Sequence, residues 1–296
     1  MTEMISVVGH AALDYLFEVE RIASPNESYP ILEYETLFGG GAANIAAAIA
    51  TLGGNASLIS AVGNDFEHSG FESHLENIGV DLSLLYHIED KKCTRAFVYT
   101  DRQHNQSSYF YWGSSAKFPE LEPPEVDFVH LATAEASFNA RMSKKADFVC
   151  FDPGQDLVTY SKENLVTILD NTDILFANRH EIRRVSSMTH RSFEDLKNSI
   201  DTIIVTCDAG GSRIYHQGSH IHIPAVKVEA VDPTGAGDGY RAGFLVAFKK
   251  GFSLETCGKI GAVVASFVVE RTGCQTNLPT WEIMQKRYEE NFGQLP

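Results

Sequence analysis

The chain has 296 residues, 44% of them hydrophobic, which is enough for one large α/β domain with an accessory element or for two smaller domains. Acidic residues outnumber basic ones by 39 to 24, a formal net charge of −15. This charge argues against nucleic acid or an anionic membrane as partner, because both carry the same sign. Any phosphate that the protein binds must therefore be held by local groups.

The five cysteines are scattered and form no C-x-x-C pair, so the sequence predicts neither a disulfide framework nor a structural zinc site. We expect a reducing, cytoplasmic setting. The N-terminus does not resemble a signal peptide, and the most apolar stretch, residues 260–269, is too short to cross a bilayer. The expectation is a protein that is neither exported nor inserted in a membrane.

The N-terminal part of the chain alternates strand and helix patterns. Residues 5–9 predict a buried strand, and Gly39-Gly40-Gly41 opens an alanine-rich helix over residues 42–52. A strand over residues 57–62 and a helix near residues 66–77 follow. Together these elements indicate a βαβ unit.

Two segments interrupt this rhythm. Residues 94–100 and 107–112 alternate as two strands around a polar tip, and they predict a hairpin. With residues 11–38, which are more polar and contain a turn signal, this hairpin is expected to form one small accessory sheet. We predict one domain over residues 1–296, with lid segments at about 11–38 and 87–115 inserted in it.

From Asp127 onwards, short apolar runs alternate mostly with helical segments, which is typical of parallel strands buried on both faces. These runs cover residues 128–132, 148–151, 174–176 and 203–206. An antiparallel edge hairpin is predicted over residues 212–215 and 219–223, and helices over residues 237–250 and 254–269 close the domain. The predicted fold class is α/β: three layers, α/β/α, with a mainly parallel central sheet and a small β-sheet lid.

The most informative segment is Val231 to Asp238, with the sequence VDPTGAGD. Its turn, Gly235-Ala236-Gly237, leads directly into an apolar helical pattern. Glycines let backbone N–H groups approach a ligand, and a helix N-terminus carries unpaired donors, so the turn suits an anionic phosphoryl group. Asp238 is then placed to accept the proton of a hydroxyl nucleophile. The alternative is an ordinary helix start with an acid that interacts favourably with the helix dipole.

In an open α/β sheet, ligands bind beyond the carboxyl ends of the strands. Asp14 follows the first predicted strand and either accepts hydrogen bonds from two vicinal hydroxyls or is a solvated loop acid. Asn44 lies in the first turn of an otherwise apolar helix, and its polar partners are either a ligand or backbone. The sequence leaves both alternatives open.

Polar residues also follow three later strands. Asn178 and Glu181 suggest a phosphate contact and a carboxylate that organises magnesium-bound water, but the same spacing is a helix capping box. Thr206 either donates its hydroxyl to a phosphate or only ends a strand. Asp152 and Gln155 stand just after the strand of residues 148–151.

Three histidines, His216, His220 and His222, fall on the predicted edge hairpin, whose polarity explains them more simply than a metal site does. The chain contains neither G-x-x-x-x-G-K-[ST] nor the H-R-D and D-F-G motifs. Neither a P-loop nor a protein-kinase mechanism is therefore expected.

Taken together, these residues resemble the ribokinase (PfkB) family of ATP-dependent carbohydrate kinases over essentially the whole chain. The likeness is carried by the early strand with Asp14, the Gly-rich start at residues 39–44, Asn178-x-x-Glu181 and DPTGAGD. A narrower resemblance is to the archaeal broad-specificity nucleoside kinases. The runs that carry it are VGHAALDY (8–15), FDPGQDL (151–157), TGAGDGYRAGF (234–244), ASFVVE (265–270) and GCQTNLPTW (273–281).

The resemblance implies a ribokinase-like fold and a role for each matching residue. It implies Asp238 as the catalytic base and the backbone of Gly235, Ala236 and Gly237 as an anion hole. The residues implied on the acceptor are Asp14, Gly40, Asn44, Gln106 and Gln155, the first three of them on its ribose. The residues implied along ATP and its magnesium are Asn178, Glu181, Thr206, Asp208, Gly211, Gly235 and Gly237.

Two departures from the family pattern affect this expectation. Asp208 stands where the family usually has glycine, and a carboxylate there would repel the triphosphate. Ala42 and Ala43 stand where ribokinases have a lysine, which counts against free ribose as acceptor.

Asp232 and Thr234 occupy positions that help to bind a monovalent cation such as K⁺ in some relatives.

The expected activity is transfer of the γ-phosphoryl group of ATP to the 5′-hydroxyl of a nucleoside, with Mg²⁺ on the donor phosphates. Phe110 or Trp112 either faces the base or only packs the lid, and the sequence leaves both alternatives open. The alternatives are a sugar or sugar-phosphate kinase of the same fold, and a nucleotide-binding regulator without catalysis. The expected partners are a nucleoside, ATP and, through paired lids, a second copy of the chain, with no nucleic acid and no membrane.

Overall fold

The computed structural model describes residues 3–103 and 105–296. Its large sheet has eight strands in the order β14-β13-β12-β11-β10-β9-β1-β4, of which the last six are parallel and β13 and β14 are antiparallel. The strands are β1 (Ile5–Val8), β4 (Ala56–Ile59), β9 (Val126–Leu131), β10 (Ala146–Phe151), β11 (Ile174–Asn178), β12 (Thr202–Thr206), β13 (Ser212–His216) and β14 (Ser219–Ile223). The predicted parallel sheet with an antiparallel edge hairpin is confirmed.

Helices cover both faces of this sheet. Val7 and Val8 are neighbours in β1 but belong to different apolar cores, because successive side chains of a strand point to opposite faces. The core that contains Val7 includes residues of α1, α7 and α8, and the core that contains Val8 includes residues of α3 to α6. The helices are α1 (Gly41–Thr51), α2 (Phe71–Asn77), α3 (Ala136–Met142), α4 (Lys162–Leu169), α5 (Arg179–Thr189), α6 (Phe193–Ser199), α7 (Ala236–Lys249), α8 (Leu254–Val268) and α9 (Trp281–Phe292). The three-layer α/β/α prediction is therefore confirmed.

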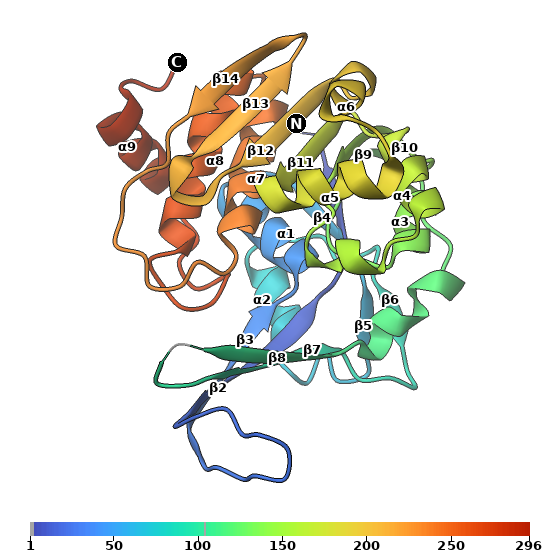
Figure 1. Ribbon diagram of the computed structural model, residues 1–296, viewed down its shortest axis with the longest axis vertical. Coiled ribbons are helices and arrows are strands. Elements are labelled where there is room, and N and C mark those ends of the chain that lie inside the picture. Colours follow the sequence, from blue (N-terminus) through green and yellow to red (C-terminus); the bar gives the residue numbers. More distant parts are fainter. Residues whose placement is uncertain (1–2, 104) are drawn as a thin grey trace.

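A separate sheet of four strands lies below the large domain in Figure 1. Its order is β3-β2-β7-β8, with bounds β2 (Ala12–Val19), β3 (Ile31–Gly39), β7 (Thr94–Thr100) and β8 (Gln106–Tyr111). The loop between β2 and β3, drawn in blue, extends farthest from the large domain. Two segments of the chain that are far apart in sequence thus form one sheet.

The small sheet has two chemically different faces. Asp14, Ala96 and Phe110 are paired in register across β2, β7 and β8, so they share one face, which we call the inner face. The opposite, outer face carries an aromatic cluster of Phe17, Tyr34, Tyr99 and Tyr109. The inner face is the side on which Asp14 approaches the large domain.

Several predicted boundaries were wrong. The strand predicted over residues 57–62 is two strands, because the chain leaves the large sheet at Ser60, whose carbonyl accepts from Tyr86 N–H. The second of them, β5 (Ala61–Gly63), pairs with β6 (Tyr86–Ile88). Helix α2 begins at Phe71 rather than at residue 66, because Gly70 has a left-handed backbone (φ 80°) that interrupts the helix. The sequence interpretation also missed α9.

Three short 3₁₀ helices complete the described chain: η1 (Gly113–Glu120), η2 (Gln155–Thr159) and η3 (Asp208–Gly210). They follow β8, β10 and β12, so η2 and η3 lie at the carboxyl ends of strands of the large sheet, where the functional residues were expected. No helix in the described part of the chain is long and apolar enough to cross a membrane.

Candidate active site

The segment 231–238 forms the start of α7, as the sequence predicted. Gly235 is the N-cap residue, with a left-handed backbone (φ 79°), and a Cβ atom there would lie 2.7 Å from Cys274 Sγ, so only glycine fits. Asp238 lies in the first turn of α7. The first turn of this helix, where a helix has unpaired backbone donors, contacts α1 through the hydrogen bond between Asp238 and Asn44.

The Asp238 carboxylate is largely buried, with 20% of its side chain exposed. Its Oδ2 accepts a hydrogen bond from Asn44 Nδ2 at 2.9 Å, and its Oδ1 lies 3.4 Å from Arg241 Nη1. Burial raises the pKa of Asp238, and the Arg241 charge and the Asn44 hydrogen bond lower it. These two neighbours favour the ionised form, which is the form that a proton acceptor needs.

Asp14 lies within β2 and not in a loop, so its alternative as a solvated loop acid was wrong. Burial, together with the negative charge of Asp238, raises the pKa of Asp14 to about 7. A Cβ atom on Gly39 would lie 1.9 Å from Asp14 Oδ2, so β3 approaches this carboxylate as closely as a glycine permits. Gly40 has a positive φ of 90°, and a Cβ there would lie 2.4 Å from the His10 carbonyl oxygen. The prediction that these glycines open a helix is confirmed, because Gly40 is the N-cap residue of α1.

Asn44 is the meeting point of a chain of hydrogen bonds that the sequence interpretation missed. Gln275 Nε2 donates to Asn44 Oδ1 at 2.9 Å, and Gln275 Oε1 lies 3.0 Å from His74 Nε2. With its Oδ1 accepting from Gln275, Asn44 must turn its amide NH₂ toward Asp238. The contact between Gln275 and Asn44 joins positions 231 residues apart in sequence. The sequence pointed to Gln275 only because it lies in the GCQTNLPTW run.

Arg241 is the second residue that the interpretation missed. Its Nη2 donates to Asp152 Oδ1 at 2.7 Å, and both side chains are largely buried, with 12% and 3% of their surfaces exposed. Asp152, which the sequence placed at a strand end, thus contacts the same guanidinium as Asp238 does. The signal for Arg241 was its place in the TGAGDGYRAGF run.

The residues expected along the donor lie at the ends of β11 and β12. Asn178 and Thr206 are direct register partners there. Asn178 Oδ1 caps α5 by accepting from His180 N–H and Glu181 N–H, and Glu181 Oε2 accepts from Asn178 N–H at 2.7 Å. The capping box is therefore formed, and it leaves the Asn178 amide NH₂ and the second Glu181 oxygen without hydrogen bonds to described residues.

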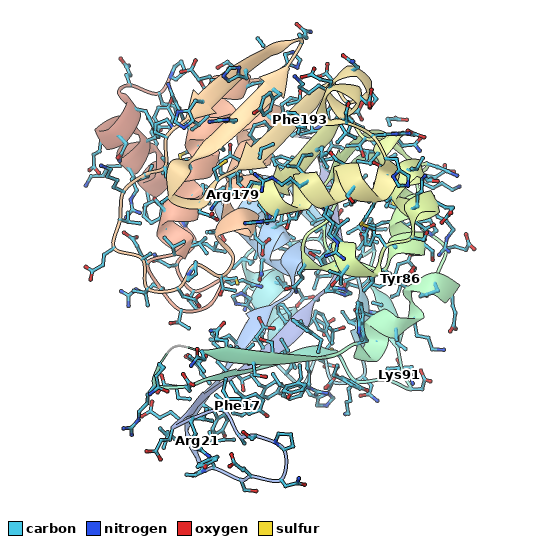
Figure 2. The ribbon with its side chains drawn as sticks, in the orientation of Figure 1. Phe17, Arg21, Tyr86, Lys91, Arg179 and Phe193 are labelled. Atoms are coloured by element: carbon cyan, nitrogen blue, oxygen red, sulfur yellow. The ribbon has the colours of Figure 1, made fainter. Side chains whose placement is uncertain are left out.

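Asp208 follows in η3 with an unusual backbone, a positive φ of 50° that favours glycine. Its carboxylate forms an ion pair with Arg179 (Nη2–Oδ2 2.6 Å) that is largely exposed, with 53% and 73% of the two side chains accessible. Figure 2 shows Arg179 on the large domain at the start of α5. Gly211 has a φ of 79°, and a Cβ there would lie 2.0 Å from the Ile223 carbonyl oxygen.

Four further expected residues lie outside these contacts. Asp232 Oδ1 accepts from Thr234 N–H at 2.9 Å, so both stand in one turn before α7. Gln106 is exposed at the far end of β8, where it donates to Thr100 Oγ1 at 3.2 Å. Gln155 is exposed in η2. The structure does not bring either glutamine into contact with the Asp14 and Asp238 carboxylates.

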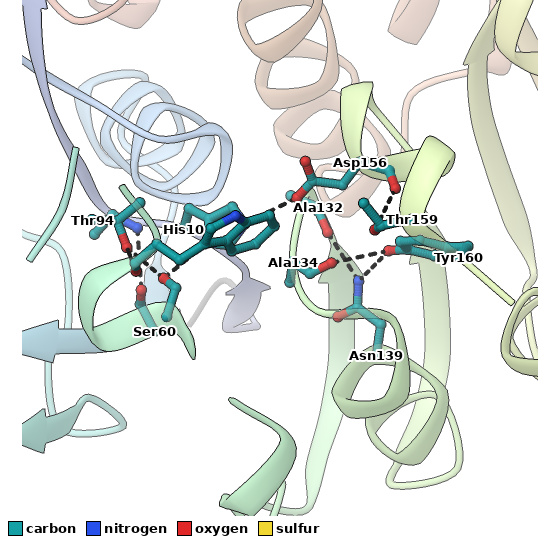
Figure 3. Close-up of polar contacts among 12 residues, drawn as sticks. His10, Ser60, Thr94, Ala132, Ala134, Asn139, Asp156, Thr159 and Tyr160 are labelled. Carbon is teal, nitrogen blue, oxygen red and sulfur yellow. Dashed lines mark hydrogen bonds and ion pairs between the residues drawn. The ribbon is translucent and has the colours of Figure 1, made fainter. Parts of the chain in front are cut away.

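The base of the small sheet is joined to the large domain through His10, which follows the end of β1 by two residues (Figure 3). His10 Nε2 lies 3.0 Å from Asp156 Oδ2 in η2, and Nδ1 lies 2.9 Å from Ser115 Oγ in η1. The Thr94 hydroxyl, at the first residue of β7, donates to Ser115 Oγ at 2.6 Å. This network connects η1, η2 and β7 beside the strand that carries Asp14.

Among the described residues, no three or more His, Cys, Asp or Glu side chains gather as they would in a metal site. The predicted edge histidines lie on β13 and β14, where His216 is within 3.3 Å of Asp201 and His222 contacts the Gly210 carbonyl. Their position agrees with the expectation of a polar edge hairpin.

Comparison with known proteins shows the family. The model of the pfkB family of carbohydrate kinases matches residues 2–281. The chain is 46% identical to a nucleoside kinase of Methanocaldococcus jannaschii, over 98% of each chain, and 41% identical to a nucleoside kinase of Methanothermobacter thermautotrophicus, over 98% of this chain and 96% of that one.

Solved structures agree with these relatives. The crystal structure of the M. jannaschii nucleoside kinase superimposes with a TM-score of 0.95, covering 98% of this chain and 99% of that one. A Burkholderia thailandensis nucleoside kinase in complex with inosine is 25% identical, with a TM-score of 0.90, covering 99% of this chain and 98% of that one. The chain therefore belongs to the pfkB family of carbohydrate kinases, phosphotransferases with an alcohol group as acceptor.

Proposed function

We propose that the protein is an ATP-dependent nucleoside kinase that phosphorylates the 5′-hydroxyl of its acceptor. The observation that carries this proposal is the meeting of Asp14, Asn44 and Asp238 at the start of α7. Asp14 is suited to accept hydrogen bonds from two vicinal ribose hydroxyls, and Asp238 lies at a helix N-terminus that attracts phosphate. The names of the relatives and the inosine in the B. thailandensis structure support this choice of acceptor.

In this proposal Asp238 accepts the proton of the 5′-hydroxyl while the hydroxyl oxygen attacks the γ-phosphorus of ATP. The new bond joins O5′ to phosphorus, the bond from that phosphorus to the β–γ bridging oxygen breaks, and ADP leaves with the electron pair. Backbone N–H groups of Gly235 and Gly237 stabilise the charge on the transferred group, and the Ala236 N–H, which donates to the Pro233 carbonyl at 3.3 Å, has to share or give up that bond to join them. Asp14, Gly40 and Asn44 hold the ribose.

The inner face of the small sheet supplies aromatic rings for the base. Phe110 is 53% exposed and shares this face with Asp14, and Trp112 follows it with 38% exposure. The small sheet then acts as a lid, formed by residues of the segments 11–38 and 87–115, that excludes water from the reaction. Gln106 stands on this lid and reaches the acceptor only if the lid moves toward the large domain, whereas Gln155 would contact the acceptor from η2 of the large domain.

On the donor side, Asn178, Thr206 and the backbone at Asp208 and Gly211 line the phosphates. Magnesium, when bound, neutralises part of the donor charge. The second oxygen of Glu181, which is without hydrogen bonds to described residues, fits an outer position that holds metal-bound water.

A monovalent cation such as K⁺ fits the turn before α7. One Asp232 oxygen accepts from Thr234 N–H, and the other has no hydrogen bond to described residues. Oxygen ligands are those that such cations prefer. We propose Asp232 and the backbone near Thr234 as its ligands, and a cytoplasmic location for the enzyme.

The activity is tested by offering ATP with a panel of inosine, guanosine, cytidine, adenosine, ribose, fructose and fructose 1-phosphate. Nucleoside monophosphates are the expected products. Phosphorylation of the sugars alone would contradict the nucleoside assignment in favour of a sugar kinase, and absence of turnover with every acceptor would favour a regulator.

Replacing Asp208 by Gly is expected to lower the KM for ATP roughly three- to tenfold at low salt. The substitution removes a carboxylate near the triphosphate, relieves the positive φ and releases Arg179 from an exposed ion pair. Steady-state kinetics at two salt concentrations measures the effect, which salt should diminish. Arg179→Met, alone and combined with Asp208→Gly, is the control: an unchanged ATP KM in all three variants would place this pair outside the donor site.

The outer face of the lid suits a second copy of the chain. Phe17 stacks between Tyr34 and Tyr99, with ring centroids 6.2 and 4.8 Å away, and Figure 2 shows Phe17 on the small sheet, away from the large domain. Tyr34 and Tyr109 are 71% and 64% exposed. An exposed apolar patch of this kind is typical of an interaction surface, and we propose a homodimer through paired lids.

The double substitution Tyr34→Ser/Tyr109→Ser is expected to weaken self-association at least about tenfold, because exposed tyrosines commonly dominate the energy of such interfaces. Sedimentation equilibrium measures it. Ile283→Ser, which removes a 51% exposed apolar side chain from α9, is the matched control. A monomeric wild type, or equal association of all three proteins, would contradict the dimer.

A further inference from the structure

Arg241 lies on α7, four positions after Gly237, and its guanidinium lies beside the first turn of that helix. Side chains of an α-helix lean toward its N-terminus, so a residue four positions after Gly237 covers that glycine. A Cβ atom on Gly237 would lie 2.5 Å from Arg241 Nη1, which confirms that the guanidinium lies against the first turn of α7. The guanidinium therefore lies directly beside the anion-binding turn and its carboxylate.

The Arg241 guanidinium needs negatively charged partners to stay beside the N-terminus of α7. A helix N-terminus carries partial positive charge and disfavours a neighbouring guanidinium. Arg241 is nevertheless only 12% exposed, and it is retained by two carboxylates: Asp152 at 2.7 Å and Asp238 at 3.4 Å. Asp152 makes the shorter and better buried contact, so it is the anchor, and Asp238 is the group that the anchored charge acts on.

Among the residues that the structure describes, the other ionisable groups that interact with Asp238 or Arg241 are acidic or neutral. The ionisable groups that interact with Asp238 or Arg241 come from separate elements and are Asp14 on β2, His130 on β9, Asp152 after β10, Glu181 on α5 and Cys274 after α8. Burial lowers the pKa of His130 to about 3, with a further contribution from Arg241, so this histidine adds no positive charge. Arg241 is thus the cation that balances the acids around the transfer site.

We propose that Arg241 is a positioning residue that keeps the Asp238 carboxylate ionised and oriented toward the acceptor hydroxyl, while Asp152 fixes the guanidinium in place. The proposal rests on the proposed function, in which Asp238 is the base. It adds to that function a second buried carboxylate, Asp152, and a cation that lies between Asp152 and Asp238. Without the guanidinium, burial and the Asp14 charge would favour a protonated Asp238, which cannot accept a proton.

The test is the pH dependence of kcat in the double variant Arg241→Met/Asp152→Asn, measured at saturating acceptor so that protonation of Asp14 in acceptor binding does not set the acidic limb. Both partners are changed because Arg241→Met alone would leave the buried Asp152 unpaired and could unfold the protein. The acidic limb of the profile is expected to move upward by about one to three pH units, because a neighbouring cation is lost. Thermal unfolding of the same preparation shows whether the fold is kept.

Two further variants complete the experiment. Arg241→Lys keeps a positive charge, so its acidic limb should return toward that of the wild type. Arg191→Met/Asp170→Asn removes an ion pair of the same 2.7 Å length at the opposite edge of the large sheet and should leave the profile in place. An unchanged limb in a folded Arg241→Met/Asp152→Asn variant, or an equal shift in Arg241→Lys, would overturn the proposal. All variants are assayed with whichever alcohol the wild type phosphorylates. If the wild type does not phosphorylate nucleosides, that result contradicts only the proposed function, and the role of Arg241 is still tested.

Discussion

Replacing Asp238 by Asn is expected to lower kcat by a factor of about 10² to 10⁴, the usual contribution of a positioned general base. The amide has the shape of the carboxylate and can still accept from Asn44 Nδ2, whose distance to Asp238 Oδ2 is 2.9 Å. It cannot take the proton of the 5′-hydroxyl, because an amide oxygen is a very weak base. Steady-state kinetics with ATP and a nucleoside measures kcat, and KM for both substrates should change far less than kcat.

The matched control for this variant is Asp195→Asn. Asp195 occupies the same third position of a helix, α6, and its oxygens likewise accept from neighbouring groups, but it lies on the other side of the large sheet from α7. It therefore reports what the loss of a first-turn carboxylate does to stability alone. If Asp238→Asn kept wild-type turnover while both variants remained folded, Asp238 would not be the base.

The sequence predicted the fold and the start of α7 because both depend on local patterns. Buried parallel strands appear as short apolar runs, and the glycines at 235 and 237 stand next to an apolar helical pattern. The division of residues 57–62 into β4 and β5 was not predictable in this way, because it depends on Ser60 meeting Tyr86. Hydrophobic patterns carry no information about such a change of partner.

The same limit applies to the candidate site. Arg241 contacts Asp152, 89 positions away, and Gln275 contacts Asn44, 231 positions away, so neither pair is visible in a local pattern. For Glu181 the difficulty was different: a capping box and a carboxylate near magnesium require the same residue at the same spacing. The structure shows the capping box, and it also leaves one oxygen of Glu181 for a second role.

The acceptor site offers a test that does not alter its carboxylates. Replacing Gly39 by Ala is expected to lower kcat/KM for the nucleoside about 10- to 150-fold, the effect of losing one hydrogen bond to a charged group. The new methyl group would lie 1.9 Å from Asp14 Oδ2 and 2.8 Å from Oδ1, so the whole carboxylate has to turn away from the ribose. The loss should appear mainly in KM for the acceptor, with KM for ATP changing little.

Asp14→Asn separates this steric effect from the charge of the carboxylate. Because burial raises the pKa of Asp14 to about 7, the wild type should bind its acceptor less well as the pH falls below 7 and the carboxylate becomes protonated. Asp14→Asn, which has no such proton to gain, should bind weakly at every pH and lose this dependence. A pH-independent acceptor KM in the wild type would contradict an ionised Asp14 as the ribose ligand.

Gly41→Ala is the matched control for the glycine substitution. A methyl group at Gly41 would lie 3.4 Å from Thr133 Oγ1 and 3.9 Å from Asp238 Oδ1, distances that the site tolerates with little movement. Both glycines border the same acceptor site, so a difference between the two variants isolates the displacement of Asp14 from any general effect of filling that site. Equal losses in Gly39→Ala and Gly41→Ala would mean that filling the acceptor site causes the loss, and that displacement of Asp14 does not.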